Sequence, residues 1–149
     1  MNNNFPDINI LPITAQNING ALSIGGCELN NLVEKFGTPL YVYDEDTIRS
    51  ICKQFTAEFN KFYQPTKIEY STKAFSNPVV NKIIDEEGLD IDVVTGGELA
   101  VAIASNFPPG RINFHGNNKS EIELQEAIEY GIGTITIDSF HEINLLEKI

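Results

Sequence analysis

Residues 67–105 read KIEYSTKAFSNPVVNKIIDEEGLDIDVVTGGELAVAIAS, and this stretch decides the fold. Its apolar runs and turn residues predict two strand–helix units, with strands over 67–71 and 91–94 and helices over 78–87 and 96–105. Asn77 and Pro78 are an N-cap residue and a first-turn proline, a pair typical of a helix start. Thr95 and Glu98 have the spacing of a capping box, which marks a second start. A strand followed by a helix, twice in succession, favours a parallel sheet.

The same alternation continues to the end of the chain. Strands are predicted over 111–114 and 133–137. Ser120 with Glu123, and Ser139 with Glu142, have the spacing of capping boxes, so helices are predicted to start after Ser120 and after Ser139. The last helix is expected to run to Ile149. Four such units predict an α/β fold with right-handed crossovers, either an open doubly wound sheet or a barrel. No dinucleotide-binding glycine motif and no P-loop motif occurs, so we favour a partial (β/α)8 TIM-type barrel of about four βα units.

A strand and helix segment precedes these units. Residues 1–20 are rich in Asn and are expected to form a loosely ordered lead-in, within a first region that we bound at 1–28. The barrel part is expected over 29–149. Inside it, a helix is predicted over 29–36, a strand over 40–43, where Tyr41 and Tyr43 are expected to pack, and a helix over 44–63. The side of the four-stranded sheet that faces the barrel interior is expected to be apolar.

The composition narrows the classes of function. The 149-residue chain has a formal net charge of −11, which argues against a nucleic-acid partner and against an anionic membrane surface. No signal peptide and no apolar run of membrane-spanning length is present, so we expect a cytoplasmic protein. Cys27 and Cys52 are too far apart in the sequence to form a metal-binding pair, and neither has a histidine at metal-binding spacing. We therefore expect reduced thiols and no metal site.

Lys73 is the first candidate catalytic residue. It follows the 67–71 strand, and reactive groups in α/β barrels sit at the carboxyl ends of strands. A barrel mouth can remove part of the solvation of such a lysine, which favours the neutral amine that Schiff-base chemistry needs. On position alone, a solvated loop lysine is the competing interpretation.

A family resemblance adds to this position. The matching segments are Phe36–Asp44, Tyr70–Asn77, Asp92–Leu99, Phe114–Ser120 and Ile135–Glu142. They resemble, in order and at suitable spacing, segments of the pyridoxal-phosphate-dependent decarboxylases built on the alanine-racemase-like barrel, and in particular the diaminopimelate decarboxylases. Ser71 stands where the lysine motif of the family usually has Ala, and Phe75 where a polar residue is common.

The resemblance implies that Lys73 carries pyridoxal 5′-phosphate as a Schiff base. It implies decarboxylation of meso-diaminopimelate to L-lysine and CO2, a small-molecule substrate and a homodimer with shared active sites. It also implies that Asp92 binds near the cofactor and supports the lysine, whereas a strand carboxylate paired with a solvent cation is the alternative. His115 and Asn117 either line the pocket or have a structural role.

The glycines and Glu98 have simpler expected roles. Gly96 and Gly97 either allow a ligand to approach the backbone or, as we favour, serve the strand-to-helix turn. Glu98 is expected to act as a helix cap and not as an acid. The phosphate-binding loop and the other half of the barrel are expected beyond residue 149, so the chain alone is expected to be inactive. Arginine, ornithine or carboxy-polyamine decarboxylation, or a truncated non-catalytic remnant, remain open as alternatives.

Overall fold

The computed structural model describes residues 10–149, so the predictions for residues 1–9 lie outside it. The chain divides after residue 51 into two compact units, which are described separately. Among the described residues, no helix is long and apolar enough to cross a membrane. Cys27 is exposed and Cys52 is buried, and neither forms a disulfide within the described residues.

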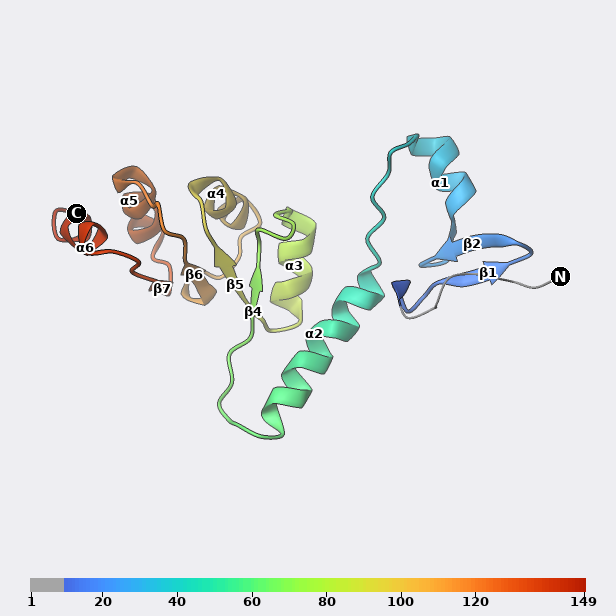
Figure 1. The fold of residues 1–149 in the computed structure, drawn as a ribbon, viewed down its shortest axis with the longest axis horizontal. Helices are drawn as coiled ribbons and strands as arrows, with labels where there is room; N and C mark the ends of the chain where they lie inside the picture. Colours follow the sequence, from blue (N-terminus) through green and yellow to red (C-terminus); the bar gives the residue numbers. More distant parts are fainter. Residues whose placement is uncertain (1–9) are drawn as a thin grey trace. The chain divides into compact units, whose positions relative to one another are not determined.

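The first unit contains a small antiparallel sheet where the sequence predicted a loosely ordered lead-in (Figure 1). Its strands run in the order β1 (Gln16–Ile18), β2 (Ala21–Ile24) and β3 (Cys27–Glu28), followed by α1 (Leu29–Phe36). Asn19 and Gly20 join β1 to β2, and both have positive φ. Gly25 and Gly26 join β2 to β3 in the same way. Two-residue connections of this kind are the preferred turns of hairpins, and the Asn-Gly pair was an overlooked signal.

The strand predicted over 40–43 is wrong. These residues lie outside the regular elements, between α1 and α2 (Glu45–Asn60), and no ladder joins them to a strand of the described part of the chain. β-branched and aromatic residues favour a strand only when a neighbouring strand pairs with them, because their preference reflects packing on a pleated surface. Tyr41 is among the most exposed side chains, and Tyr43 is exposed too, so neither packs as predicted.

The second unit is a four-stranded parallel sheet in chain order (Figure 1). Its elements are β4 (Glu69–Ser71), α3 (Pro78–Glu86), β5 (Asp90–Val93), α4 (Gly96–Ala104), η2 (Pro109–Arg111), β6 (Ile112–Phe114), α5 (Glu121–Tyr130), β7 (Thr134–Ile135) and α6 (Phe140–Leu146). The four predicted βα units are therefore confirmed. Some elements are shorter than predicted: β4 covers three residues of 67–71, β7 covers two residues of 133–137, and α6 ends at Leu146 and does not reach Ile149.

The two faces of this sheet differ in polarity. Side chains on the helix-covered face are apolar and buried; they include Ile91, Val93, Ile112 and Phe114. The opposite face is polar, because the register aligns Ser71 with Asp92, Asp92 with Asn113 and Asn113 with Thr134. The prediction of an apolar barrel-facing surface is therefore wrong. Side chains alternate across a strand, so a polar residue at every second position marks this face as polar.

Candidate active site

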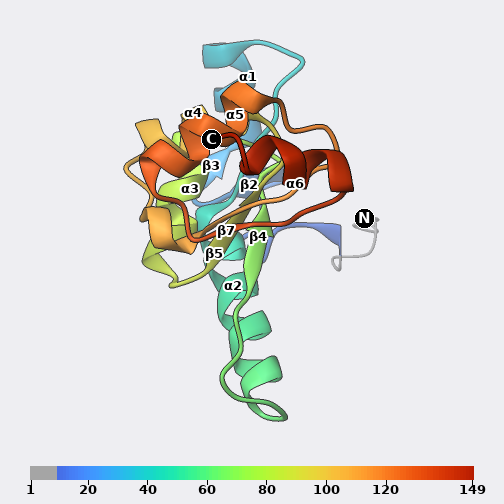
Figure 2. The same ribbon diagram turned by 90° about the vertical axis from the view of Figure 1, so that its left-hand side faces the viewer.

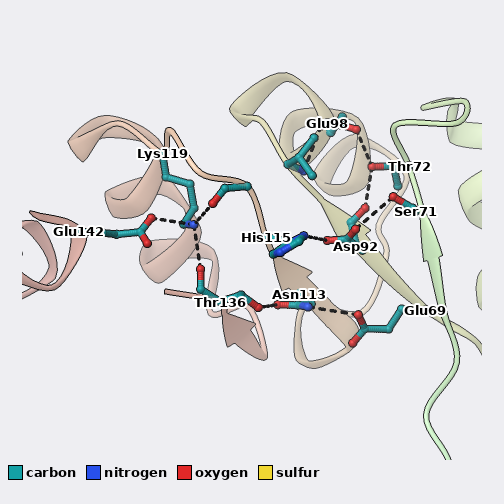
Figure 3. A network of polar contacts seen from close by, with 12 residues as sticks. Glu69, Ser71, Thr72, Asp92, Glu98, Asn113, His115, Lys119, Thr136 and Glu142 are labelled. Atoms are coloured by element: carbon teal, nitrogen blue, oxygen red, sulfur yellow. Dashed lines mark hydrogen bonds and ion pairs between the residues drawn. The ribbon is translucent and has the colours of Figure 1, made fainter. Parts of the chain in front are cut away.

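Lys73 lies in the turn that follows β4, at the carboxyl end of the sheet. The residue before it, Thr72, is buried and fixed to the next strand. The Thr72 N–H donates to the Asp92 carbonyl at 2.9 Å, and the Thr72 hydroxyl lies 2.9 Å from the same oxygen and 3.0 Å from Glu98 Oε1 (Figure 3). The backbone that carries Lys73 is thus held firmly against β5.

The Lys73 side chain itself is exposed. No hydrogen bond or ion pair engages its amine within residues 10–149. The first four βα units therefore do not supply the desolvation that the barrel mouth was expected to give. They supply a fixed backbone and an amine that is open to a ligand.

Asp92 is the third residue of β5 and pairs with Ser71 of β4, the strand that leads into the turn of Lys73. Its Oδ2 accepts a hydrogen bond from the Ser71 hydroxyl at 3.1 Å. Its Oδ1 is buried and has no hydrogen-bond partner among the described residues, while His115 Nδ1 lies 3.9 Å away (Figure 3). A buried carboxylate oxygen without a donor is unfavourable, which makes Asp92 Oδ1 a place where a cationic or N–H group would be stabilised.

A second set of hydrogen bonds crosses the polar face of the sheet, next to Asp92. Asn113 Nδ2 donates to Glu69 Oε2 at 3.1 Å, and Thr136 Oγ1 donates to Asn113 Oδ1 at 3.0 Å (Figure 3). The contact joins β4, β6 and the end of β7 without a side chain from β5. The sequence analysis did not single out these residues, although the alternation of polar positions in each strand was a usable signal.

Three glutamates, each at the third position of its helix, connect consecutive βα loops. One oxygen of each binds near its own helix start: Glu98 Oε2 accepts from Val94 N at 3.0 Å, Glu123 Oε2 from Ser120 N at 2.8 Å and Glu142 Oε2 from Asp138 N at 2.7 Å. The other oxygen contacts the preceding loop: Glu98 reaches Thr72, Glu123 reaches Gly96 and Glu142 reaches Lys119.

These contacts extend the predicted capping boxes. All three cap residues, Thr95, Ser120 and Ser139, accept a hydrogen bond from the glutamate N–H as predicted. Only Ser120 completes the reciprocal box, because Glu98 and Glu142 bind the N–H one residue earlier. The carboxylates therefore neutralise the helix starts and also hold neighbouring loops together. Glu98 acts as a cap, as expected.

The hydrogen bond from Ser120 N–H to Glu123, followed by that from Gly96 N–H, holds the pKa of the Glu123 carboxyl below its usual range. Gly96 is a glycine because Glu123 lies so close: a Cβ at Gly96 would stand 2.8 Å from Glu123 Cγ. At Gly97 the nearest atom to an added Cβ is Thr95 Oγ1 at 3.8 Å. Gly96 thus serves the strand-to-helix turn and its cap, in line with the interpretation favoured from the sequence.

Lys119 is the most buried charge at this end of the sheet, with a side chain 0% exposed. Its Nζ donates to the carbonyls of Gly116 at 2.6 Å and Thr136 at 2.9 Å, and to Glu142 Oε1 at 2.7 Å (Figure 3). With its donors engaged, this amine is not available to a ligand. It fixes the loop after β6 against the loop after β7, and the sequence analysis did not identify it.

His115 and Asn117 both lie in the loop after β6, at the mouth of the sheet, and both are exposed. The parallel strands of the second unit lie side by side (Figure 2), so the residues that follow β4, β5 and β6 lie at one end of the sheet, where Lys73 also lies. Within residues 10–149, no group of three or more His, Cys, Asp or Glu residues is placed to hold a metal ion. The free amine and the orphan carboxylate oxygen fit an aldehyde-bearing cofactor that is bound through a lysine and stabilised by a nearby acid.

Comparisons with known proteins agree with this chemistry. Residues 45–149 match the family described as "Pyridoxal-dependent decarboxylase, pyridoxal binding domain". The diaminopimelate decarboxylase of Bacillus subtilis (strain 168) is 49% identical over 134 residues, which are 90% of this chain and 30% of that protein.

Solved structures give the same result. The crystal structure of diaminopimelate decarboxylase from M. jannaschii in co-complex with L-lysine superimposes with a TM-score of 0.83 at 34% identity, over 91% of this chain and 32% of that one. The lysine/ornithine decarboxylase of Vibrio vulnificus in complex with putrescine gives a TM-score of 0.69 at 26% identity, over 80% of this chain and 32% of that one. The chain thus spans about a third of the length of the proteins that it matches.

Proposed function

The chain belongs to the pyridoxal-dependent decarboxylases, and we propose that in its full-length context it takes part in the decarboxylation of meso-diaminopimelate to L-lysine and CO2. Pyridoxal 5′-phosphate is the cofactor of this family, and it supplies an electron sink for the pair left behind by CO2. The observation that carries the proposal is an open lysine amine on a fixed backbone at the carboxyl end of a barrel strand, in a chain 49% identical to a diaminopimelate decarboxylase.

We assign the cofactor-binding amine to Lys73. Thr72 anchors the preceding backbone to β5, and the Lys73 side chain is exposed at the carboxyl end of the sheet. The other lysine of this region, Lys119, is buried and engaged by three oxygens, so it does not compete. Lys73 is therefore the amine in this half of the site that is placed to form a bond to the cofactor.

Asp92 is assigned a positioning role. Ser71 holds its Oδ2, which leaves the buried Oδ1 with no donor among the described residues. This oxygen can hold the Lys73 ammonium when the amine is released from the cofactor. Asp92 is not assigned the role of the principal acid.

The phosphate of the cofactor is expected to bind elsewhere. A phosphate dianion favours helix starts with free N–H groups, and the starts of α4, α5 and α6 already hold a carboxylate of this chain. We therefore expect the phosphate-binding loop in the part of the relatives that this chain does not span, together with the groups that select the substrate.

The alternative substrates are ornithine, arginine and carboxy-polyamines. Among the solved structures, the identity is 34% to the diaminopimelate decarboxylase of M. jannaschii and 26% to the lysine/ornithine decarboxylase of V. vulnificus, and this difference favours diaminopimelate. A homodimer in the cytoplasm and a small amino acid as the ligand complete the proposal.

Borohydride reduction of the holoenzyme, followed by peptide mapping, tests the site. The phosphopyridoxyl label is expected on Lys73, and a label on another lysine with Lys73 unmodified would show the assignment to be wrong. A parallel assay of CO2 release compares meso-diaminopimelate with L-ornithine and L-arginine. Faster turnover of L-ornithine or L-arginine would refute the proposed substrate, but it would not affect the assignment of Lys73.

A further inference from the structure

The buried oxygen Asp92 Oδ1 requires a donor, and the groups around it narrow the choice. Asp92 is held at its other oxygen by Ser71, and its side chain is 15% exposed, so water reaches it poorly. Among the described residues the nearest ionisable nitrogen recorded for it is His115 Nδ1, at 3.9 Å. This separation is too long for a hydrogen bond and short enough for a small rotation of the imidazole to close.

Other charged groups near this face of the sheet already have partners among the described residues. Glu69 accepts from Asn113, and Glu142 accepts from Lys119 and from Asp138 N–H. Lys119 in turn donates to three oxygens. Lys73 has no such partner within residues 10–149, and its amine is engaged when the cofactor is bound. Of the described ionisable groups, His115 is then the one that lies within 4 Å of Asp92 Oδ1.

The loop that carries His115 is held rigidly, although its imidazole is not. The His115 N–H donates to the Val93 carbonyl at 2.8 Å, which extends the β5–β6 ladder by one residue. Gly116 has φ +103°, and a Cβ there would stand 2.8 Å from the Val94 carbonyl oxygen. Lys119 then holds the Gly116 carbonyl from the other side. The imidazole remains 55% exposed and can rotate on this fixed base.

We propose that His115 is a positioning residue that donates its Nδ1–H to Asp92 Oδ1 and so holds the carboxylate in place while the Lys73 amine is bonded to the cofactor. The geometry of the His115–Asp92 pair does not depend on the proposed function. The effect of the pair on turnover does rest on that function. On release of the lysine amine, Asp92 exchanges the imidazole for the ammonium.

The first test uses the holoenzyme, in which the Lys73 amine is bonded to the cofactor. His141, which is exposed, serves as the reference histidine. In the neutral form, 15N shifts of the rings report which nitrogen carries the proton. His115 is expected to be protonated on Nδ1, whereas exposed His141 shows the Nε2–H form that a solvated imidazole prefers. Asp92→Ala should convert His115 to the His141 pattern, and Ser71→Ala should not. Identical patterns for both histidines in the unchanged chain would overturn the proposal.

The second test uses the holoenzyme and a matched pair of variants. Asn at position 115 places an N–H near the position of Nδ1, and Gln places one near that of Nε2. His115→Asn is expected to keep kcat within about threefold, and His115→Gln to lower it about tenfold, with KM unchanged in both, because a hydrogen bond to a charged group is lost only in the second. Equal losses in both variants, or none in either, would refute the positioning role without bearing on the labelling of Lys73.

Discussion

Replacing Gly96 and Gly97 separately by Ala tests the packing of the α4 start against Glu123. The two glycines are adjacent in the first turn of the same helix, so the change in backbone entropy is similar for both, about 0.5–1 kcal/mol in favour of Ala. At Gly97 the new Cβ makes an ordinary contact at 3.8 Å. Gly97→Ala is therefore expected to be neutral or slightly stabilising.

At Gly96 the new Cβ would stand 2.8 Å from Glu123 Cγ and 3.0 Å from Oε1, so the glutamate must move. Its movement breaks the 2.7 Å bond from Gly96 N–H, and a hydrogen bond to a charged group contributes about 1.5–3 kcal/mol. After the entropy gain is subtracted, Gly96→Ala should lower the free energy of unfolding by about 1–2 kcal/mol.

Urea denaturation followed by circular dichroism measures both variants under the same conditions. Repeating Gly96→Ala in a Glu123→Ala background isolates the contact, because the steric conflict and the hydrogen bond are then absent. The cost of Gly96→Ala should largely vanish there. Equal stability of the two single variants, or an undiminished cost of Gly96→Ala in the second background, would show that Glu123 does not determine the need for glycine.

Four other outcomes are expected. Asp92→Asn should slow turnover of the holoenzyme but retain the cofactor absorbance, and loss of folded protein would indicate a structural role instead. Lys119→Met leaves Glu142 buried without its cation and should lower the free energy of unfolding by about 3–5 kcal/mol. Part of this loss should be recovered in the Lys119→Met/Glu142→Gln double variant, and urea denaturation measures both. The pKa of Glu123 is lowered in the folded chain, so its ionised carboxylate stabilises the fold at pH values above the usual glutamate pKa. This contribution is lost as the pH falls through the pKa of the folded state. Glu123→Gln should therefore flatten the acid side of a stability–pH curve. The 149-residue chain alone should release no CO2 from meso-diaminopimelate, and a turnover that depends on Lys73 would contradict the expected division of the site.

The order of elements could be predicted because the signals that set it are local. Asn77 with Pro78, and the Ser or Thr caps of the next three helices, satisfy backbone groups within a few residues, so they are visible in the sequence. The Asn19-Gly20 hairpin turn was equally local and was overlooked. The error over 40–43 has another origin, since a strand depends on a partner that no local pattern supplies.

The arrangement of the site was less accessible from the sequence. The position of Lys73 after a strand was a local feature, and the family resemblance sharpened it. The contacts of Lys119 depend on residues in two different loops, of which Thr136 is 17 positions away. Likewise the orphan oxygen of Asp92 is defined by how β4, β5 and β6 align, and neither composition nor helical spacing carries that information.

The three glutamates show why a local motif can also serve the active site. Each uses Oε2 for its own helix start, which is the part that the sequence predicts, and Oε1 for the loop before it. Through Oε1, Glu98 contacts the residue before Lys73, and Glu142 holds the lysine that fixes the loop of His115. The helix starts are therefore filled by the chain's own carboxylates, and their dipoles are used for rigidity and not for binding an anion. This division of labour supports the proposal that these four βα units fix the amine and its acidic neighbour, while the anionic end of the cofactor binds at other loops.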